Sequence, residues 1–305
     1  MNLELGADAQ EFGRAARRAF EAAGGDDLVL RADADPSLRE NLVGPILRGL
    51  GVSELKPRAD TDELEAAAAL CRSAGYWALP YPVAECLSAP ADLDVDGLIV
   101  VADHAPAGVV AGLSKRWATV TLAGVRSTVV GQSEARPALM AGLTLAQLDH
   151  AGAGDVALAL TLPCWTLLGM LDRAMDLTIA HVRLREQFGQ ALSAFQGVQF
   201  QLTDAEVERA GVDMLAKYAL WSIATGRPEA TDDALALRSA TLEAAEVVFR
   251  ICHQLHGAVG FCDETALSWL SRYSQPLRRL PWGLSATRDR LARRAQQTGL
   301  TGLYA

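Results

Sequence analysis

Two long helical patterns meet at residues 181–196, and this junction constrains the fold more than any other part of the 305 residues. Before the junction, apolar residues recur at three- and four-residue steps, as in an amphipathic helix: Leu167, Leu168, Leu171, Ala174, Met175, Ile179 and Val182. We expect Gly189 to end this helix, because glycine readily adopts the left-handed conformation that follows a last turn. Arg185 and Phe188 would then lie at a helix C-terminus and point away from the helix's own core.

The side chains at this helix end suit two different roles. Arg185 can pair with a phosphate through its planar guanidinium, and Phe188 can cover an aromatic ring. A basic residue near a helix C-terminus also stabilises the helix dipole without any ligand. This segment alone therefore favours neither a binding site nor a plain helix end.

The composition excludes several classes of function. A formal net charge of -9 argues against nucleic acid as the main partner, because phosphate backbones bind to basic patches. The longest uncharged run, residues 156–171, is shorter than the ~20 residues of a membrane-spanning helix. We therefore expect a buried helix there and no membrane span. No signal peptide is visible, and the five cysteines form no Cys-x-x-Cys pair, which favours a reduced, cytoplasmic protein.

The pattern along the chain predicts a mostly α fold with a small β domain. Residues 1–91 form an N-terminal helical domain, with helices over 9–23, 36–49 and 61–73. Residues 92–150 hold short β-branched runs separated by Gly, Asp and Pro, which predict a reduced β domain. Residues 151–305 predict a C-terminal four-helix bundle, with helices over 155–187, 196–225, 230–257, 263–274 and 283–297.

A second informative segment, residues 251–264, follows the third long helix to its end. Gly257 and Gly260 would let backbone N–H groups approach a ligand closely, and Gln254 lies one turn earlier. A glycine-terminated helix followed by a turn explains the same residues without a ligand. His253 and His256 share a helix side, but no third ligand is apparent nearby, so we expect no metal site.

Taken together, the two segments resemble the acyl-CoA dehydrogenase family. Its pattern is a helix ending in Arg-x-x-Phe-Gly, then Phe-Gln, then a helix ending in Gln-x-x-Gly-Gly-x-Gly-Tyr. The order of helices, β domain and four-helix bundle is also similar. The family's flavoproteins bind FAD between subunits, so the resemblance implies an FAD shared with a partner subunit. The cofactor-binding residues that it implies are Arg185 and Gln187 at the pyrophosphate, Phe188, Phe195 and Gln196 along the dinucleotide, and Gln254, Leu255, His256, Gly257 and Ala258 from another chain of a tetramer.

The activity implied by the resemblance is α,β-dehydrogenation of an acyl-CoA thioester. A carboxylate removes the α-proton while the β-hydrogen leaves as hydride to the flavin. The family places this glutamate at one of two locations, which correspond to residues 280–283 and 157–160 here, and neither carries an acid. Asp155 is the local substitute and a weak candidate for the base, although it is more simply a helix-start residue.

We therefore expect a subunit of a heteromeric α2β2 acyl-CoA dehydrogenase. A homologous partner would supply the catalytic Glu and the β surface that covers the flavin, which is reduced here. The family resemblance makes a bulky or steroid-derived acyl-CoA plausible as substrate. Two alternatives stay open: an autonomous homo-oligomeric enzyme that uses Asp155 as base, and a non-enzymatic scaffold or binding module.

Overall fold

The N-terminal part of the protein is a layer of short helices, as the sequence predicts. The computed structural model describes residues 3–299, so the outer ends of the first and last predicted domains, residues 1–2 and 300–305, lie outside the described residues. The Asp60 carboxylate accepts the backbone N–H of Asp62 at 2.7 Å and so caps the start of α4, the helix of this layer that packs on the C-terminal bundle. The helices are α1 (Ala7–Ala22), α2 (Asp27–Ala34), α3 (Arg39–Gly49), α4 (Thr61–Tyr76) and α5 (Val83–Leu87).

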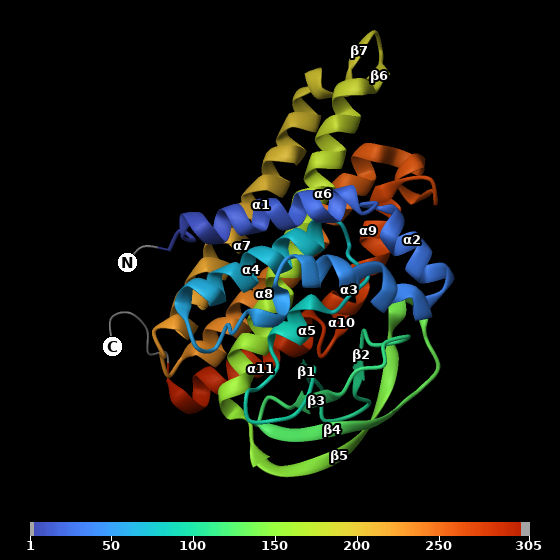
Figure 1. Ribbon diagram of the computed structural model, residues 1–305. Coiled ribbons are helices and arrows are strands. Elements are labelled where there is room, and N and C mark those ends of the chain that lie inside the picture. The colour runs from blue at the N-terminus through green and yellow to red at the C-terminus, as the bar shows by residue number, and fades with distance from the viewer. Residues whose placement is uncertain (1–2, 300–305) are drawn as a thin grey trace.

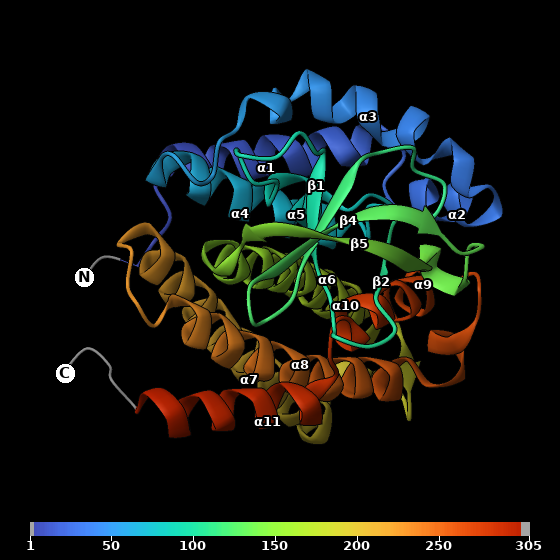
Figure 2. The same ribbon diagram turned by 90° about the horizontal axis from the view of Figure 1, so that it is seen from below.

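A five-stranded sheet follows, in the order β1-β3-β4-β5-β2, with β1 and β3 parallel and the other pairs antiparallel. Only the two strands β4 and β5 exceed four residues, so the β domain is small, as expected. Figure 2 shows it between the N-terminal helices and the C-terminal bundle. The strands are β1 (Gly97–Val100), β2 (Ala107–Gly108), β3 (Trp117–Val120), β4 (Val125–Gln132) and β5 (Ala141–Ala151).

The C-terminal helices form a bundle around α6, the central helix of the molecule (Figure 1). The stretch Ala153–Leu184 is long and apolar enough to cross a membrane by length and composition, but 83% of its most apolar window is buried inside the protein. This burial identifies α6 as a core helix, as the sequence predicts. The bundle consists of α6 (Val156–Leu184), α7 (Gln196–Ala224), α8 (Ala230–His256) and α11 (Leu284–Thr298), with the short helices α9 (Ala266–Tyr273) and α10 (Gln275–Arg279) between the last two.

Glycines let the N-terminal layer pack directly on the bundle. A Cβ added to Gly75 of α4 would lie 1.8 Å from the carbonyl oxygen of Thr166 on α6. A Cβ added to Gly169 of α6 would lie 1.9 Å from the carbonyl oxygen of Arg72 on α4. The backbones of α4 and α6 therefore touch where each helix has a glycine. With the N-terminal layer, the sheet and the bundle in place, the prediction of a mostly α fold with a small β domain is confirmed.

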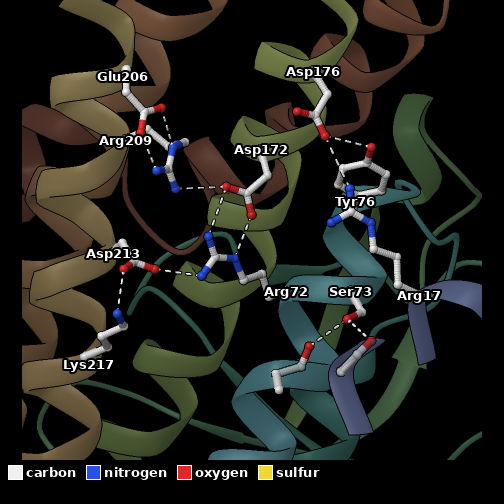
Figure 3. A network of polar contacts seen from close by, with 12 residues as sticks. Arg17, Arg72, Ser73, Tyr76, Asp172, Asp176, Glu206, Arg209, Asp213 and Lys217 are labelled. Carbon is white, nitrogen blue, oxygen red and sulfur yellow. Dashed lines mark hydrogen bonds and ion pairs between the residues drawn. The ribbon is translucent and has the colours of Figure 1, made fainter. Parts of the chain in front are cut away.

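A network of ion pairs joins the same two helices to α7 (Figure 3). The Arg72 guanidinium donates to both oxygens of Asp172, at 2.6 and 3.1 Å, and to Asp213 at 2.6 Å. Arg209 reaches Asp172 at 3.1 Å, and Lys217 reaches Asp213 at 2.9 Å. Because Arg72 is the one residue of α4 in this group, it ties the N-terminal layer to the bundle.

Replacing Arg72 by Met is expected to lower the free energy of unfolding by about 2 kcal/mol, because two partly buried carboxylates each lose a partner. Burial opposes ionisation of Asp213, but Lys217 and Arg72 outweigh it and lower the pKa of this carboxyl. The stabilisation is therefore present above an unfolded-state pKa of about 3.9 and is lost as pH falls through the lower folded-state pKa. Urea unfolding at pH 7 and at pH 3 measures both effects.

The matched control is Arg14→Met, which removes an exposed pair with Glu11. Such surface pairs contribute about 0–1 kcal/mol. An Arg72 variant as stable as this control at pH 7 would contradict the role assigned to the network.

Candidate functional site

The chain leaves α6 through a short hairpin rather than through a glycine-capped helix end. Helix α6 ends at Leu184, and the next backbone N–H, of Arg185, still bonds to the His181 carbonyl at 2.8 Å. Strands β6 (Glu186–Gln187) and β7 (Gln190–Ala191) then pair across a turn in which Phe188 and Gly189 both have positive φ, 52° and 83°. The prediction that Gly189 ends the helix was wrong, because Gly189 instead forms the two-residue turn that a tight hairpin requires.

The β6–β7 hairpin projects from the end of the bundle (Figure 1). Phe188 is 92% exposed, and its ring meets that of Phe195 edge-on, with ring centroids 6.3 Å apart. Leu184, just before the hairpin, is 84% exposed. The guanidinium of Arg185 is exposed and forms no ion pair with any residue in 3–299. Large apolar side chains exposed close together are typical of a surface that another molecule covers.

The second segment forms the C-terminal end of α8. Gly257 takes φ 65° and ψ −147°, a conformation that is essentially restricted to glycine, and a Cβ there would meet open space. Gln254 and Ala258 are exposed beside it. Gly260 has a different role, since a Cβ at Gly260 would lie 2.8 Å from the Cβ of His256. Gly257 therefore leaves room for a ligand, whereas Gly260 allows the chain to pack on its own helix.

Two histidines bring the segments together. The ring of His181, in the last turn of α6, stacks on the ring of His256, in the last turn of α8, with centroids 4.3 Å apart. His256 is buried and its Nδ1 lies 2.8 Å from the Cys252 carbonyl. Burial lowers the pKa of both histidines, so both rings are neutral near pH 7 and can stack. The predicted cofactor residues thus share one end of the bundle, although the His256 side chain packs inward and only its backbone borders the exposed turn.

These residues suit part of a dinucleotide site. The Arg185 guanidinium has no ion pair among the described residues and suits a pyrophosphate, and Phe188 offers an exposed ring. Gln187 and Gln196 are exposed near the hairpin, while Phe195 and Leu255 are half-buried. None of the main cavities found in the described residues is lined by these side chains, which fits a site that a second chain completes. No group of three or more metal-ligating side chains occurs in the described part of the chain, which includes His253 and His256.

Asp155, the weak candidate for the base, is held in a buried ion-pair cluster. Both oxygens of its carboxylate are engaged: one accepts from Arg126 Nε at 2.8 Å and Nη2 at 2.7 Å, and the other lies 3.2 Å from Arg58. Asp155 is 4% exposed. A carboxylate bound on both oxygens joins β4 to the start of α6 and has no free oxygen for a substrate proton.

Asp155→Asn is therefore expected to lower stability by about 3 kcal/mol, because Arg58 would lose its carboxylate partner and Arg126 would keep only Asp92 as a counter-charge. The turnover of any acyl-CoA by the assembled enzyme should not change. Thermal unfolding and steady-state kinetics measure the two effects, with Asp149→Asn on the exposed part of β5 as the control. A variant of unchanged stability that lost turnover would restore Asp155 as the base.

The two locations that the family uses for its glutamate do meet in space. Ala159 and Leu160 of α6 line the same cavity as Leu280 and Pro281, and the cavity measures about 40 Å³. Since a buried water needs roughly 10–15 Å³, the cavity has room for no more than a few water molecules, and a thioester does not fit. The two locations are therefore adjacent, but the cavity between them is too small for an acyl-CoA substrate.

Sequence reasoning missed one acid at this place. Glu85 of α5 is the one acidic residue among the described residues that line this cavity. It also lines a neighbouring cavity of about 50 Å³. Burial raises the pKa of Glu85, which favours its neutral form. Its place in a five-residue helix after two prolines gave no signal, because its approach to α6 and residues 276–281 depends on the tertiary fold.

Comparison with known proteins agrees with this architecture. The family described as acyl-CoA dehydrogenase, C-terminal domain, matches residues 161–294. Acyl-CoA dehydrogenase FadE28 of Mycobacterium tuberculosis is 36% identical over 92 residues, which cover 30% of this chain and 27% of that protein. Probable acyl-CoA dehydrogenase YngJ of Bacillus subtilis is 32% identical over 108 residues, 34% of this chain and 27% of that protein. The similar segment thus spans about a quarter of the length of these relatives.

Solved structures match the fold over nearly the whole chain. A variant of the Tcur3481–Tcur3483 steroid ACAD has a TM-score of 0.81 at 19% identity and covers 98% of this chain and 100% of that one. The ChsE4–ChsE5 complex from Mycobacterium tuberculosis has a TM-score of 0.74 at 16% identity, with the same two coverages. PigA with FAD and proline has a TM-score of 0.69 at 15% identity, again with the same coverages. Residues 161–294 therefore match the acyl-CoA dehydrogenase C-terminal domain, and the described residues of the chain have the acyl-CoA dehydrogenase fold.

Proposed function

We propose that this chain is a non-catalytic subunit of a cytoplasmic, heteromeric FAD-dependent acyl-CoA dehydrogenase. The observation that carries the proposal is the closed cavity of about 40 Å³, where residues 159–160 and 280–281 meet without an acid at either family location. Flavin content and acyl-CoA turnover, measured for the chain alone and with its partner, test the proposal.

In this proposal the two subunits have different roles in the reaction. FAD, when bound, accepts the β-hydrogen of the acyl-CoA as hydride. Arg185 binds the pyrophosphate, Phe188 covers one side of the dinucleotide, and Gln254 and the backbone at Gly257 add hydrogen bonds across the interface. The partner subunit supplies the carboxylate that takes the α-proton and the β surface behind the flavin ring. This chain thus binds and shields the cofactor, and the partner moves the proton.

An exposed apolar row on α7 supports a partner of the same fold. Phe200, Val207 and Met214 recur every seven residues, so they lie along one face of the helix, and they are 59%, 64% and 50% exposed. Phe188, Val259 and Phe261 are exposed at the hairpin end of the same bundle. A surface of this kind is typical of subunit contact. Two of the structures with the same fold are described as two-component proteins, and one of them as a steroid ACAD. We infer an α2β2 assembly and a bulky, steroid-like acyl-CoA substrate.

Val207→Glu is expected to prevent association with the partner, because it places an uncompensated charge in the middle of the apolar row. Size-exclusion chromatography with light scattering measures the assembly. Val130→Glu makes the same substitution at a valine of β4 that is 63% exposed, and it should leave the assembly intact. A Val207 variant that assembles like wild type would exclude this face of α7 as the interface.

A further inference from the structure

A cavity of about 700 Å³ lies in the N-terminal layer, lined by residues other than those that are predicted to contact FAD. Its walls are α3, residues 52–59, the end of α5 with the segment that follows, and Lys115 before β3. The volume falls in the range of about 300–1,000 Å³ that is usual for small-molecule sites. Nothing in the proposed flavin role uses this cavity.

The lining combines an apolar interior with charged groups. Leu47 of α3, Val52, Leu55 and Leu87 contribute aliphatic side chains. Four cationic residues, Arg48, Lys56, Arg58 and Lys115, and two acids, Glu40 and Asp96, also line it. The ion pairs of these six residues decide which charge remains for a ligand.

One of the cations, Arg58, and one of the acids, Asp96, pair with residues that do not line the cavity. Arg58 donates to the Ser88 carbonyl at 2.8 Å and lies 3.2 Å from Asp155. Asp96 accepts the backbone N–H of Arg116 at 2.8 Å and pairs with its guanidinium at 3.1 Å. Arg48, Lys56, Lys115 and Glu40 are left to face the cavity.

Glu40 cannot balance the three remaining cations. Its carboxylate accepts the Tyr81 hydroxyl at 2.7 Å and lies 3.6 Å from Lys115 and 3.9 Å from Arg48. The Lys56 ammonium forms no ion pair with any residue that the structure describes. The cavity therefore has an excess of positive charge in a protein whose net charge is -9.

The few lysines of the chain are concentrated at this cavity. The sequence has three lysines among its 28 basic residues, and two of the three line this one cavity. Because Lys presents a compact charge on a flexible stem, it suits a single anionic head group rather than a planar pair.

We propose that this cavity binds a small amphipathic anion, with its head group at Lys56 and Lys115 and its apolar body against Leu47 and Leu55. The apolar interior selects a hydrocarbon or ring body, and the unbalanced cations select a carboxylate or a phosphate ester over a neutral lipid. This site is separate from the flavin surface and would serve as a second ligand site of the same chain.

Isothermal titration calorimetry of the full chain tests the proposal, with dodecanoate, dodecyl phosphate and dodecanol as probes. Dodecanoate is expected to bind, and dodecanol to bind at least about tenfold more weakly, since a charge-assisted contact contributes about 1.5–3 kcal/mol. Tighter binding of dodecyl phosphate than of dodecanoate would identify the head group as a phosphate. Equal binding of all three probes would overturn the proposal, because the cations would then have no role.

Variants locate the site. Lys56→Met and Lys115→Met should each weaken dodecanoate binding about tenfold, and Leu55→Trp should abolish it by filling the cavity. Arg31→Met, at an exposed arginine of α2, is the matched control and should bind like wild type. Lys115→Met removes an ion pair with Glu40 and could unfold the chain. Lys56→Met then tests the proposal alone, because the Lys56 ammonium has no ion pair among the described residues. Unchanged affinity in Lys56→Met would overturn the assignment.

Discussion

The full chain purified alone is expected to be colourless and to oxidise no acyl-CoA, whereas the same chain purified with its partner should be yellow and active. The physical reason is that the hairpin tip with Phe188, which is 92% exposed, would cover only one side of the FAD. The other side would stay open to solvent. The cavity of about 40 Å³ at residues 159–160 and 280–281 also admits no thioester and holds no acid at the family locations. Visible absorption of the flavin and turnover of a steroid-like acyl-CoA measure the two properties.

The control is replacement of the partner's glutamate by glutamine in the assembled enzyme. Since a general base contributes about 10²- to 10⁴-fold to rate, turnover should fall by that factor while the yellow colour remains. A single chain that kept stoichiometric FAD and oxidised an acyl-CoA would sink the heteromer proposal. An assembled complex without flavin would instead support the non-enzymatic scaffold that the sequence left open.

The long helices were predictable because their cores repeat with the helical period. The apolar residues from Leu167 to Val182 placed α6 within three residues of its observed ends, Val156 and Leu184. The hairpin after α6 was not predictable, because it needs positive φ at Phe188, a residue that rarely adopts it. Strand β5 has no clear signal of its own within the predicted β domain, because most of its residues are exposed and it carries little apolar alternation.

The candidate site divides in the same way. The hairpin and the end of α8 could be predicted as candidate sites, because both carry residues of the family's sequence pattern. The His181–His256 stack brings them to one end of the bundle. The pairing of Asp155 with Arg126 joins residues 29 positions apart and depends on how β4 crosses the start of α6. Glu85 reaches its cavity through the same kind of long-range packing. Local patterns indicate candidate binding residues, whereas the protonation and pairing of buried acids depend on the tertiary fold.

Arg185→Ala in the assembled enzyme is expected to weaken FAD binding about ten- to a hundredfold, because a guanidinium–phosphate contact is a charge-assisted, two-point hydrogen bond. Flavin retained after dialysis, at a fixed complex concentration, measures the change. Arg183→Ala removes another exposed arginine from the last turn of α6 and should retain flavin like wild type. Arg185→Lys should give an intermediate loss, because lysine keeps the charge and loses the fork. Size-exclusion chromatography must show an intact complex for all three variants, so that flavin loss reports the contact and not the assembly. Wild-type flavin content in the alanine variant would remove Arg185 from the pyrophosphate site.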